Sequence, residues 1–242
     1  MKDNAENFGS RLGFAKSVHI PILGNGAYLT ADWVMPHHPC GIVLFAHGSG
    51  SSRNSSRNKA VASYLVSRGM GTFLLDLLTP AEERIDDMTR HLRFDIPLLA
   101  ERLVVATRWI RFQREEQELP LGYFGASTGA GAALVAAAEL GEGVAAVVSR
   151  GGRPDLAGNS LPQVTSPTLL LVGGEDAIVE DLNRKAMNLL HCTKQLTIIP
   201  GATHLFEEAG TLDQVATLAG NWFLKQFSAR KPEMTTKGGG LR

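Results

Sequence analysis

The sequence predicts an α/β domain in which a mostly parallel, twisted β-sheet carries helices on both faces and begins with an antiparallel hairpin. Three observations support this fold class. Short apolar runs without alternation are typical of strands that are buried on both faces of a parallel sheet. Segments with helical periodicity separate these runs, which indicates repeated βαβ units. An Asn-Gly pair between the first two strand-like runs favours a hairpin.

Eight strand-like runs follow one another along the chain. The first two, 14–22 and 28–35, flank Gly24-Asn25-Gly26 and are expected to pair as an antiparallel, partly exposed hairpin. The other six runs are mostly apolar and do not alternate with polar residues in the manner of a half-exposed strand, and we expect each to be a strand buried on both faces. They span 41–46, 72–78, 121–124, 144–148, 168–172 and 195–199.

Five segments between and after these runs carry helical patterns. They span 58–67, 94–113, 129–140, 179–190 and 212–227. In the longest of the internal segments, 94–113, apolar residues recur every three or four positions along one face. Pro97 is compatible with this helix because it falls in the first turn, where Asp95 can act as a cap.

We expect a single domain over residues 14–227, an N-terminal extension at 1–13 and a flexible C-terminal tail at 228–242. The chain shows no internal repeat and no Pro/Ser-rich linker that would divide it. The intervals between the later strand-like runs are too short for a large cap domain. The stretch 79–96, which contains His91, is a candidate for a modest lid.

Composition excludes several classes of function. The 24 Lys and Arg residues balance the 24 Asp and Glu residues, so we expect no nucleic-acid partner and no anionic membrane partner. No apolar stretch reaches the roughly 18 residues that a membrane span needs, and the polar N-terminus does not resemble a secretory signal. With only Cys40 and Cys192, the chain fits a reducing compartment, and we expect a cytoplasmic location.

The sharpest motif is Gly125-Ala126-Ser127-Thr128-Gly129, which follows an apolar run and precedes an alanine-rich helical segment. This is the setting of a nucleophile elbow, in which a serine occupies a strained turn between a strand and a helix. A glycine-rich turn with a capping serine is the alternative interpretation.

Two further residues fit a catalytic triad with Ser127. Asp176 follows the run 168–172, and His204 follows the run 195–199. In a parallel sheet, both positions lie at the carboxyl edge, where ligands usually bind. A serine hydroxyl needs an adjacent base and a group that orients this base, roles for which we assign His204 and Asp176. Glu175 is the alternative acid, and Asp176 would then only cap a helix.

A serine nucleophile also needs donors for the oxyanion that forms during acyl transfer. We assign the backbone N–H of Thr128 as one donor, and that of Ser49 as the second, with Gly48 as its alternative. Gly48 and Ser49 lie in the loop His47-Gly48-Ser49-Gly50. This loop lacks the Gly-Lys-Ser/Thr ending of a phosphate-binding P-loop.

Several other polar residues are candidates for the site. Arg150 and Arg153 follow the run 144–148 and are candidates for binding a substrate carboxylate or phosphate; the alternative is that they pair with Asp155 or cap helix ends. The segment His37-His38-Pro39-Cys40 lacks a partner at metal-ligand spacing, so we expect no metal. We expect Cys192 to serve packing. Four acidic residues are expected on a solvated face: Glu82, Glu83, Asp86 and Asp87.

With these residues in place, the sequence resembles the α/β-hydrolase superfamily and, within it, the dienelactone-hydrolase-like group, over roughly residues 14–227. The order Ser127, Asp176, His204 is that of the superfamily. The segments 52–58 and 149–155 also resemble a subgroup of hydrolases sometimes joined to phosphoribosyltransferase domains. Dienelactone hydrolases proper have cysteine at the elbow, whereas this chain has serine.

The resemblance implies a serine hydrolase, and we expect a carboxylesterase that acts on a small ester or lactone without a cofactor. An acyltransferase or peptidase with the same triad is one alternative. A non-catalytic hydrolase scaffold that binds a ligand is another, although an intact triad argues against it. A homodimer is compatible with the sequence.

Overall fold

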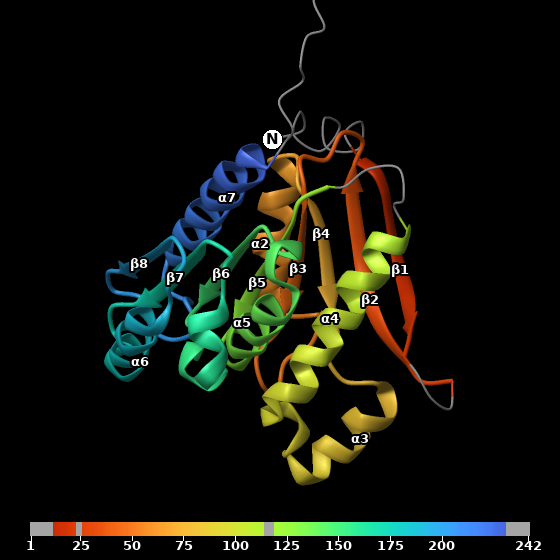
Figure 1. Cartoon of the computed structure of the whole chain (residues 1–242), viewed down its shortest axis with the longest axis horizontal. Coiled ribbons are helices and arrows are strands. Elements are labelled where there is room, and N and C mark those ends of the chain that lie inside the picture. The colour runs from red at the N-terminus through yellow and green to blue at the C-terminus, as the bar shows by residue number, and fades with distance from the viewer. Residues whose placement is uncertain (1–11, 23–25, 114–118, 231–242) are drawn as a thin grey trace, which may run out of the picture.

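The computed structural model describes residues 12–22, 26–113 and 119–230. Its centre is an eight-stranded sheet in the order β1-β2-β4-β3-β5-β6-β7-β8 (Figure 1). Strands β1 and β2 are antiparallel to their neighbours, and all other neighbouring strands are parallel, which confirms the predicted fold class. The strands are β1 (Leu12–Pro21), β2 (Tyr28–Pro36), β3 (Ile42–Ala46), β4 (Gly71–Leu75), β5 (Leu121–Ala126), β6 (Ala146–Arg150), β7 (Thr168–Gly173) and β8 (Lys194–Ile199).

The first two strands form the predicted hairpin. Their register runs from Leu12 opposite Pro36 to Pro21 opposite Tyr28, with one irregularity near the start of β1. Burial alternates along β2, as expected for a strand with one face on the core and one face nearer to solvent. Of the Asn-Gly turn, Gly26 has a positive φ of 68°, and Gly24-Asn25 lie outside the described residues.

The central strands are buried on both faces. Every residue of β3, β4, β5, β6 and β7 is buried, as predicted from their continuous apolar runs. The prediction is wrong for β8, in which only Ile199 is fully buried. As the last strand of the sheet, β8 has a neighbour on one side only, so much of its surface stays near solvent.

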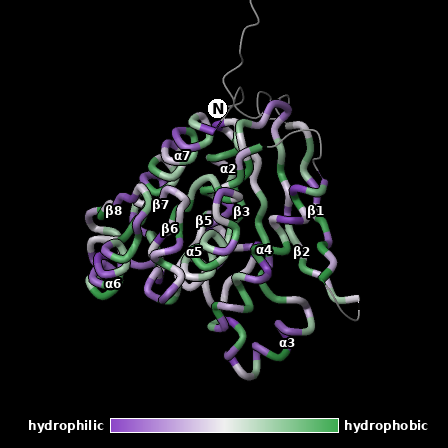
Figure 2. Tube along the Cα trace, in the orientation of Figure 1, coloured by the Kyte–Doolittle hydropathy of each residue, from purple (hydrophilic) through white to green (hydrophobic). Residues whose placement is uncertain are grey.

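Helices cover both faces of this sheet (Figure 1). Leu44 and Tyr123 point into a core shared with α4, α5 and α6, while Phe45 and Phe124 point into a core shared with α2 and α7. Figure 2 shows hydrophobic residues concentrated along the central strands. The α-helices are α2 (Ser56–Ser67), α3 (Pro80–Thr89), α4 (Ile96–Gln113), α5 (Thr128–Leu140), α6 (Ala177–Leu189) and α7 (Thr211–Ala229), and the short 3₁₀ segments are η1 (Leu92–Phe94), η2 (Gly141–Gly143) and η3 (Pro154–Gln163).

The start of α4 agrees with the sequence. Pro97 lies in the first turn, and the Asp95 carboxylate accepts a hydrogen bond from the Leu98 N–H at 3.1 Å. Within the described part of the chain, no helix is both long and apolar enough to cross a membrane.

The segment 79–96 contains α3 and η1. The prediction that its four acidic residues all lie on a solvated face is wrong for Asp86. Asp86 is only 3% exposed, and its carboxylate accepts hydrogen bonds from the backbone N–H and the guanidinium of Arg93. Glu82 accepts from the Thr79 N–H in a capping box and pairs with Arg102. A carboxylate can be buried when the fold supplies a hydrogen-bonding cation, as it does here. The pattern of charges along the sequence does not reveal this pairing.

Candidate active site

Ser127 occupies the bend between β5 and α5. Its φ of 50° and ψ of −122° are unusual for a residue with a side chain and store backbone strain at this position. The flanking glycines allow close approach of the backbone. A Cβ on Gly125 would lie 2.5 Å from the Ala130 Cα, and one on Gly129 would lie 2.4 Å from two carbonyl oxygens of the β3 end. The strand–turn–helix setting predicted for this motif is therefore present.

The fold brings Ser127, Asp176 and His204 together from the ends of three strands. The His204 Nδ1 lies 2.6 Å from Asp176 Oδ2, and the His204 Nε2 lies 3.3 Å from Ser127 Oγ. A carboxylate can only accept, so the proton belongs on Nδ1, and Nε2 is then an acceptor for the serine hydroxyl. Asp176 is the residue before α6, and its side chain bonds to His204 rather than capping that helix. Glu175, the alternative acid, is exposed.

The loop after β3 lies directly against the serine. A Cβ on Gly48 would be 3.1 Å from the Ser127 Cβ. The Ser49 N–H donates a hydrogen bond to the Thr128 Oγ1 at 2.8 Å. This N–H is one of the two donors assigned from the sequence, so in this structure it already has an acceptor beside the nucleophile. Thr128 begins α5, and its own N–H has no acceptor within the helix.

His47 holds the loop in place. Its Nδ1 donates to the Gly48 carbonyl at 2.9 Å, and its Nε2 accepts from the Leu77 N–H at 3.2 Å. Burial lowers the pKa of His47, against the opposing effects of the Gly48 carbonyl and the Asp76 charge. A neutral ring is what this arrangement requires, because one nitrogen must accept while the other donates.

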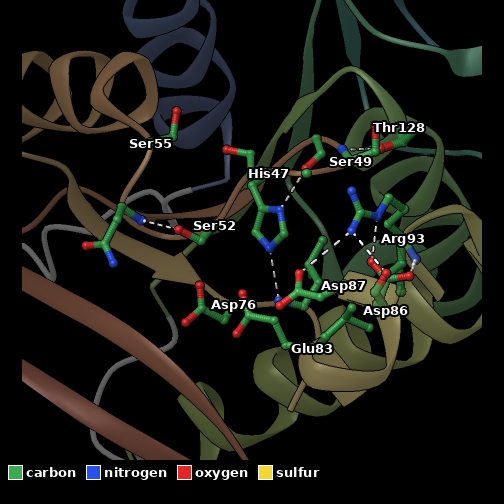
Figure 3. Close-up of a pocket in the computed structure, with 17 residues that line it drawn as sticks. His47, Ser49, Ser52, Ser55, Asp76, Glu83, Asp86, Asp87, Arg93 and Thr128 are labelled. Carbon is green, nitrogen blue, oxygen red and sulfur yellow. Dashed lines mark hydrogen bonds and ion pairs between the residues drawn. The ribbon is translucent and has the colours of Figure 1, made fainter. Parts of the chain in front are cut away.

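Two cavities adjoin at this loop and share four of its residues. The smaller, about 230 Å³, contains Ser127 and His204. The larger, about 420 Å³, lies on the His47 side (Figure 3). The shared residues are Gly48, Ser49, Ser51 and Ser55.

The larger cavity is rich in carboxylates. Figure 3 shows Asp76, Glu83 and Asp87 along it, with Arg93 beside Asp86 and Asp87. Asp76 pairs with Arg53, which is not part of the cavity lining. Burial, helped by the charges of Asp76 and Asp87, raises the pKa of Glu83. This wall of the site is therefore acidic.

The structure separates the two candidate arginines. Arg153 makes a bidentate pair with Asp155 at 2.9 and 2.7 Å and lines neither of these two cavities. Arg150 lines the smaller cavity and is only 7% exposed, and its Cζ lies over the Phe206 ring, 5.7 Å from the ring centroid. Burial, together with the nearby charge of Arg57, lowers the pKa of Arg150 to about 10, so the side chain stays charged at neutral pH.

Arg57 and Phe206 escaped the sequence reasoning. Arg57 lies in the first turn of α2 and lines the smaller cavity. The resemblance of the segment 52–58 to a subgroup of hydrolases was the one signal that pointed to it. Phe206 has a positive φ of 57°, which a sequence does not reveal. Its closeness to His204 in the sequence was the one available signal.

The remaining candidates lie elsewhere. Across residues 12–22, 26–113 and 119–230, no group of three or more His, Cys, Asp or Glu side chains is placed to hold a metal ion. His37 and His38 are exposed. Cys192 packs against the core, and burial raises the pKa of its thiol.

Residues 29–227 match the sequence model of the dienelactone hydrolase family. The chain belongs to this family. Among solved structures, a dienelactone hydrolase from Anabaena variabilis is 55% identical, with a TM-score of 0.85, and the match covers 88% of this chain and 98% of that one. The family match and the α/β-hydrolase fold confirm the resemblance noted in the sequence.

More distant structures share the fold. Est1E from Butyrivibrio proteoclasticus is 15% identical, with a TM-score of 0.71 over 88% of this chain and 99% of that one. The curated relatives include Mycobacterium tuberculosis proteins whose name proposes a phosphoribosyl transferase. They are 58% identical over 198 residues, which is 82% of this chain and 44% of theirs. This dienelactone hydrolase family member thus spans less than half the length of those relatives.

Proposed function

We propose that this hydrolase cleaves a carboxylic ester or lactone through an acyl-enzyme on Ser127. The observation that carries the proposal is the continuous chain of contacts from Ser127 Oγ to His204 at 3.3 Å and from His204 to Asp176 at 2.6 Å. A serine hydroxyl is a weak nucleophile on its own, and this arrangement supplies both a base and a group that orients the base.

In the first half of the reaction, His204 Nε2 takes the hydroxyl proton as Ser127 Oγ attacks the carbonyl carbon. Asp176 holds the imidazole in the tautomer that leaves Nε2 unprotonated, and it stabilises the imidazolium that forms. The proton then passes from His204 to the departing alkoxide, and the acyl group remains on Ser127. In a lactone, the alkoxide stays attached to the acyl group, so ring opening occurs without separation of the two parts.

The tetrahedral oxyanion is stabilised by the backbone N–H groups of Thr128 and Ser49, with Gly48 as the alternative to Ser49. The N–H of Ser49 points to the Thr128 hydroxyl in the structure, which places it next to the start of α5. The N-terminal end of α5 adds a favourable partial positive charge. In the second half of the reaction, His204 removes a proton from water as the water attacks the acyl carbon. The bond between this carbon and Ser127 Oγ then breaks, His204 returns the proton to Ser127 Oγ, and the acid is released.

The test is hydrolysis of p-nitrophenyl acetate and p-nitrophenyl butyrate by the wild-type protein and by Ser127→Ala. We expect turnover to fall by roughly 10³-fold or more in the variant, with circular dichroism unchanged. Ser67→Ala, an exposed serine at the end of α2, is the matched control and should keep wild-type turnover. Equal turnover in wild type and Ser127→Ala would overturn the proposal.

A fluorophosphonate probe gives a second readout. It should label the wild type and Ser67→Ala to the same extent, on Ser127, as located by peptide mass spectrometry. It should not label Ser127→Ala. Product analysis with added glycerol separates hydrolysis from acyl transfer, because a transferase would release the glycerol ester in place of the free acid.

A further inference from the structure

The guanidinium of Arg150 is buried in the catalytic cavity without a counter-ion. Its side chain is 7% exposed and lines the same cavity as Ser127 and His204. Its Nε and Nη1 are buried and have no hydrogen-bond partner. No ion pair of Arg150 is found among the residues that the structure describes. A buried cation without a counter-charge or hydrogen-bond acceptors is unfavourable, unless a bound ligand supplies them.

The contact with Phe206 does not satisfy the hydrogen-bond donors of the Arg150 guanidinium. The Arg150 Cζ lies over the Phe206 ring, 5.7 Å from the ring centroid, and a cation–π contact of this kind provides no hydrogen-bond acceptor for the N–H donors. The N–H donors lie in the guanidinium plane, and they are the groups that bind oxyanions in a bidentate manner. The contact with Phe206 therefore leaves the buried Nε and Nη1 donors available.

A second arginine and the N-terminus of a helix face the same space. Ser55, Arg57 and Asn58 line the cavity, and they form the cap and the first turn of α2, which has 12 residues. The Arg57 Nη1 pairs with Glu207 at 2.9 Å, but its Nε is buried without a partner. The first turn of a helix presents unpaired N–H groups and a partial positive charge, both of which favour an anion.

The charge of this cavity is one-sided. Its lining in the described structure holds Arg57, Arg150 and His204 and no acidic residue. The hydroxyls of Ser49, Ser51 and Ser55 also line it, and each can donate a hydrogen bond. The adjoining cavity has the opposite character, with four carboxylates in its lining. Two cations, a helix N-terminus and several hydroxyl donors suit a dianion with three terminal oxygens better than a planar carboxylate.

The anion would bind close to the reacting bond. Arg150 lies opposite Ala126 in the parallel pairing of β5 and β6, and its carbonyl oxygen accepts a hydrogen bond from the Ser127 N–H at 3.2 Å. A cavity of about 230 Å³ contains both Ser127 and the arginines, so one small molecule can reach both.

We propose that the substrate is a phosphorylated ester or lactone, whose phosphate group is bound by Arg150, Arg57 and the N-terminus of α2 while its carbonyl group lies at Ser127. This inference rests on the proposed function and narrows its substrate class. It makes Arg150 and Arg57 specificity-determining residues that bind a part of the substrate away from the reacting carbonyl.

The first experiment measures binding without turnover. Inorganic phosphate is titrated into the Ser127→Ala protein by calorimetry at constant ionic strength, with chloride as the control anion. We expect saturable binding of phosphate that weakens by roughly tenfold or more in Ser127→Ala with Arg150→Met. Absence of phosphate binding to Ser127→Ala would overturn the proposal, as would equal affinity in the two proteins.

The second experiment compares matched esters with the wild-type protein. The substrates are 2-acetoxyethyl phosphate, 3-acetoxypropanoate and 2-acetoxyethanol, with acetate release as the readout. We expect kcat/KM for the phosphate ester to exceed that for the neutral ester by roughly tenfold or more, with the carboxylate between them. A preference for the carboxylate or for the neutral ester would overturn the phosphate assignment.

Arginine variants separate substrate binding from support of the His204 loop. If Arg150 only braced Phe206, Arg150→Met would slow the charged and neutral esters equally, and their ratio would stay at the wild-type value. We expect the ratio to collapse in Arg150→Met and to be partly restored in Arg150→Lys, which keeps the charge. Arg57→Met is the second variant should Arg150→Met fail to fold, and it should also lower the ratio.

The outcomes distinguish this inference from the proposed function. Phosphate binding to Ser127→Ala without ester hydrolysis by the wild type would remove the function and keep the anion site. Hydrolysis of p-nitrophenyl acetate without phosphate binding would keep the function and remove the anion site.

Discussion

The backbone N–H of Ser49 donates a hydrogen bond to the side-chain hydroxyl of Thr128 at 2.8 Å, across 79 positions of sequence. The contact joins the loop after β3 to the first residue of α5. Both residues are proposed oxyanion donors through their backbone N–H groups, so a side chain of one holds the main chain of the other. The Thr128 hydroxyl therefore links the loop to α5, in addition to the hydrogen bonds of His47 that hold the loop.

Removing this hydroxyl should impair catalysis more than binding. In Thr128→Val, the Ser49 N–H loses its acceptor and the loop loses its link to α5. We expect kcat to fall by about tenfold, with little change in KM, and stability to fall by about 1 kcal/mol. Thr128→Ser, which retains a hydroxyl, should stay close to wild type. Wild-type kcat in Thr128→Val would show that this contact does not shape the oxyanion site.

Replacing Asp176 tests the choice of acid. Asp176→Asn keeps the size of the side chain but favours the wrong tautomer of His204, so kcat should fall by roughly 10³- to 10⁴-fold. Glu175→Gln is the matched control, because Glu175 is adjacent in sequence but exposed. Steady-state hydrolysis of p-nitrophenyl acetate measures both variants. A large loss in Glu175→Gln with none in Asp176→Asn would reverse the assignment.

The strained backbone at Ser127 predicts an unusual order of stability. Glycine tolerates a φ of 50° and ψ of −122°, whereas alanine keeps the Cβ that makes this conformation costly. We expect Ser127→Gly to be more stable than Ser127→Ala by about 1–2 kcal/mol in urea unfolding, although both should be inactive.

A helical position provides the comparison for this order. Lys225 lies exposed within α7, where Lys225→Gly should be less stable than Lys225→Ala by about 1 kcal/mol. If alanine were the more stable choice at both positions, the bend at Ser127 would carry no strain.

The raised pKa of Glu83 makes the stability of the wild-type protein depend on pH. Burial and the neighbouring carboxylates of Asp76 and Asp87 raise its pKa in the folded protein above the ordinary value of 4.5. The native state therefore binds this proton more tightly than the unfolded state, and stability falls as pH rises from the ordinary value through the folded pKa.

Glu83→Gln removes the charge that causes this loss. At pH 7 we expect its melting temperature to rise by on the order of 1 °C, with the difference from wild type vanishing below about pH 4, where the carboxyl is protonated in both states. Glu101→Gln is the control for removing a negative charge at an exposed position, where the carboxylate lies 3.7 Å from the Arg102 Nη1. A rise that persisted at pH 4, or that Glu101→Gln reproduced, would contradict this explanation.

The order of strands and helices could be predicted because it depends on local periodicity. Local patterns can be recognised without knowing the fold, because they involve only residues that are close in sequence. The apolar runs, the helical spacing and the Gly-x-Ser-x-Gly bend are patterns of this kind. The edge position of β8 could not be predicted, because the sequence of a strand does not show how many other strands pair with it in the sheet. The burial of Asp86 was missed for a similar reason, because it depends on Arg93 from η1 folding back onto α3.

By itself, the sequence determined the α/β class, the hairpin and the three residues Ser127, Asp176 and His204, because their spacing after successive strands follows from a one-dimensional pattern. The tertiary structure decided which charges are compensated. It pairs Arg153 with Asp155, whereas Arg150 is buried beside Ser127 and has no ion-pair partner among the residues that the structure describes. Whether a charge is desolvated and paired depends on neighbours from distant parts of the chain, and only the folded protein brings these neighbours together.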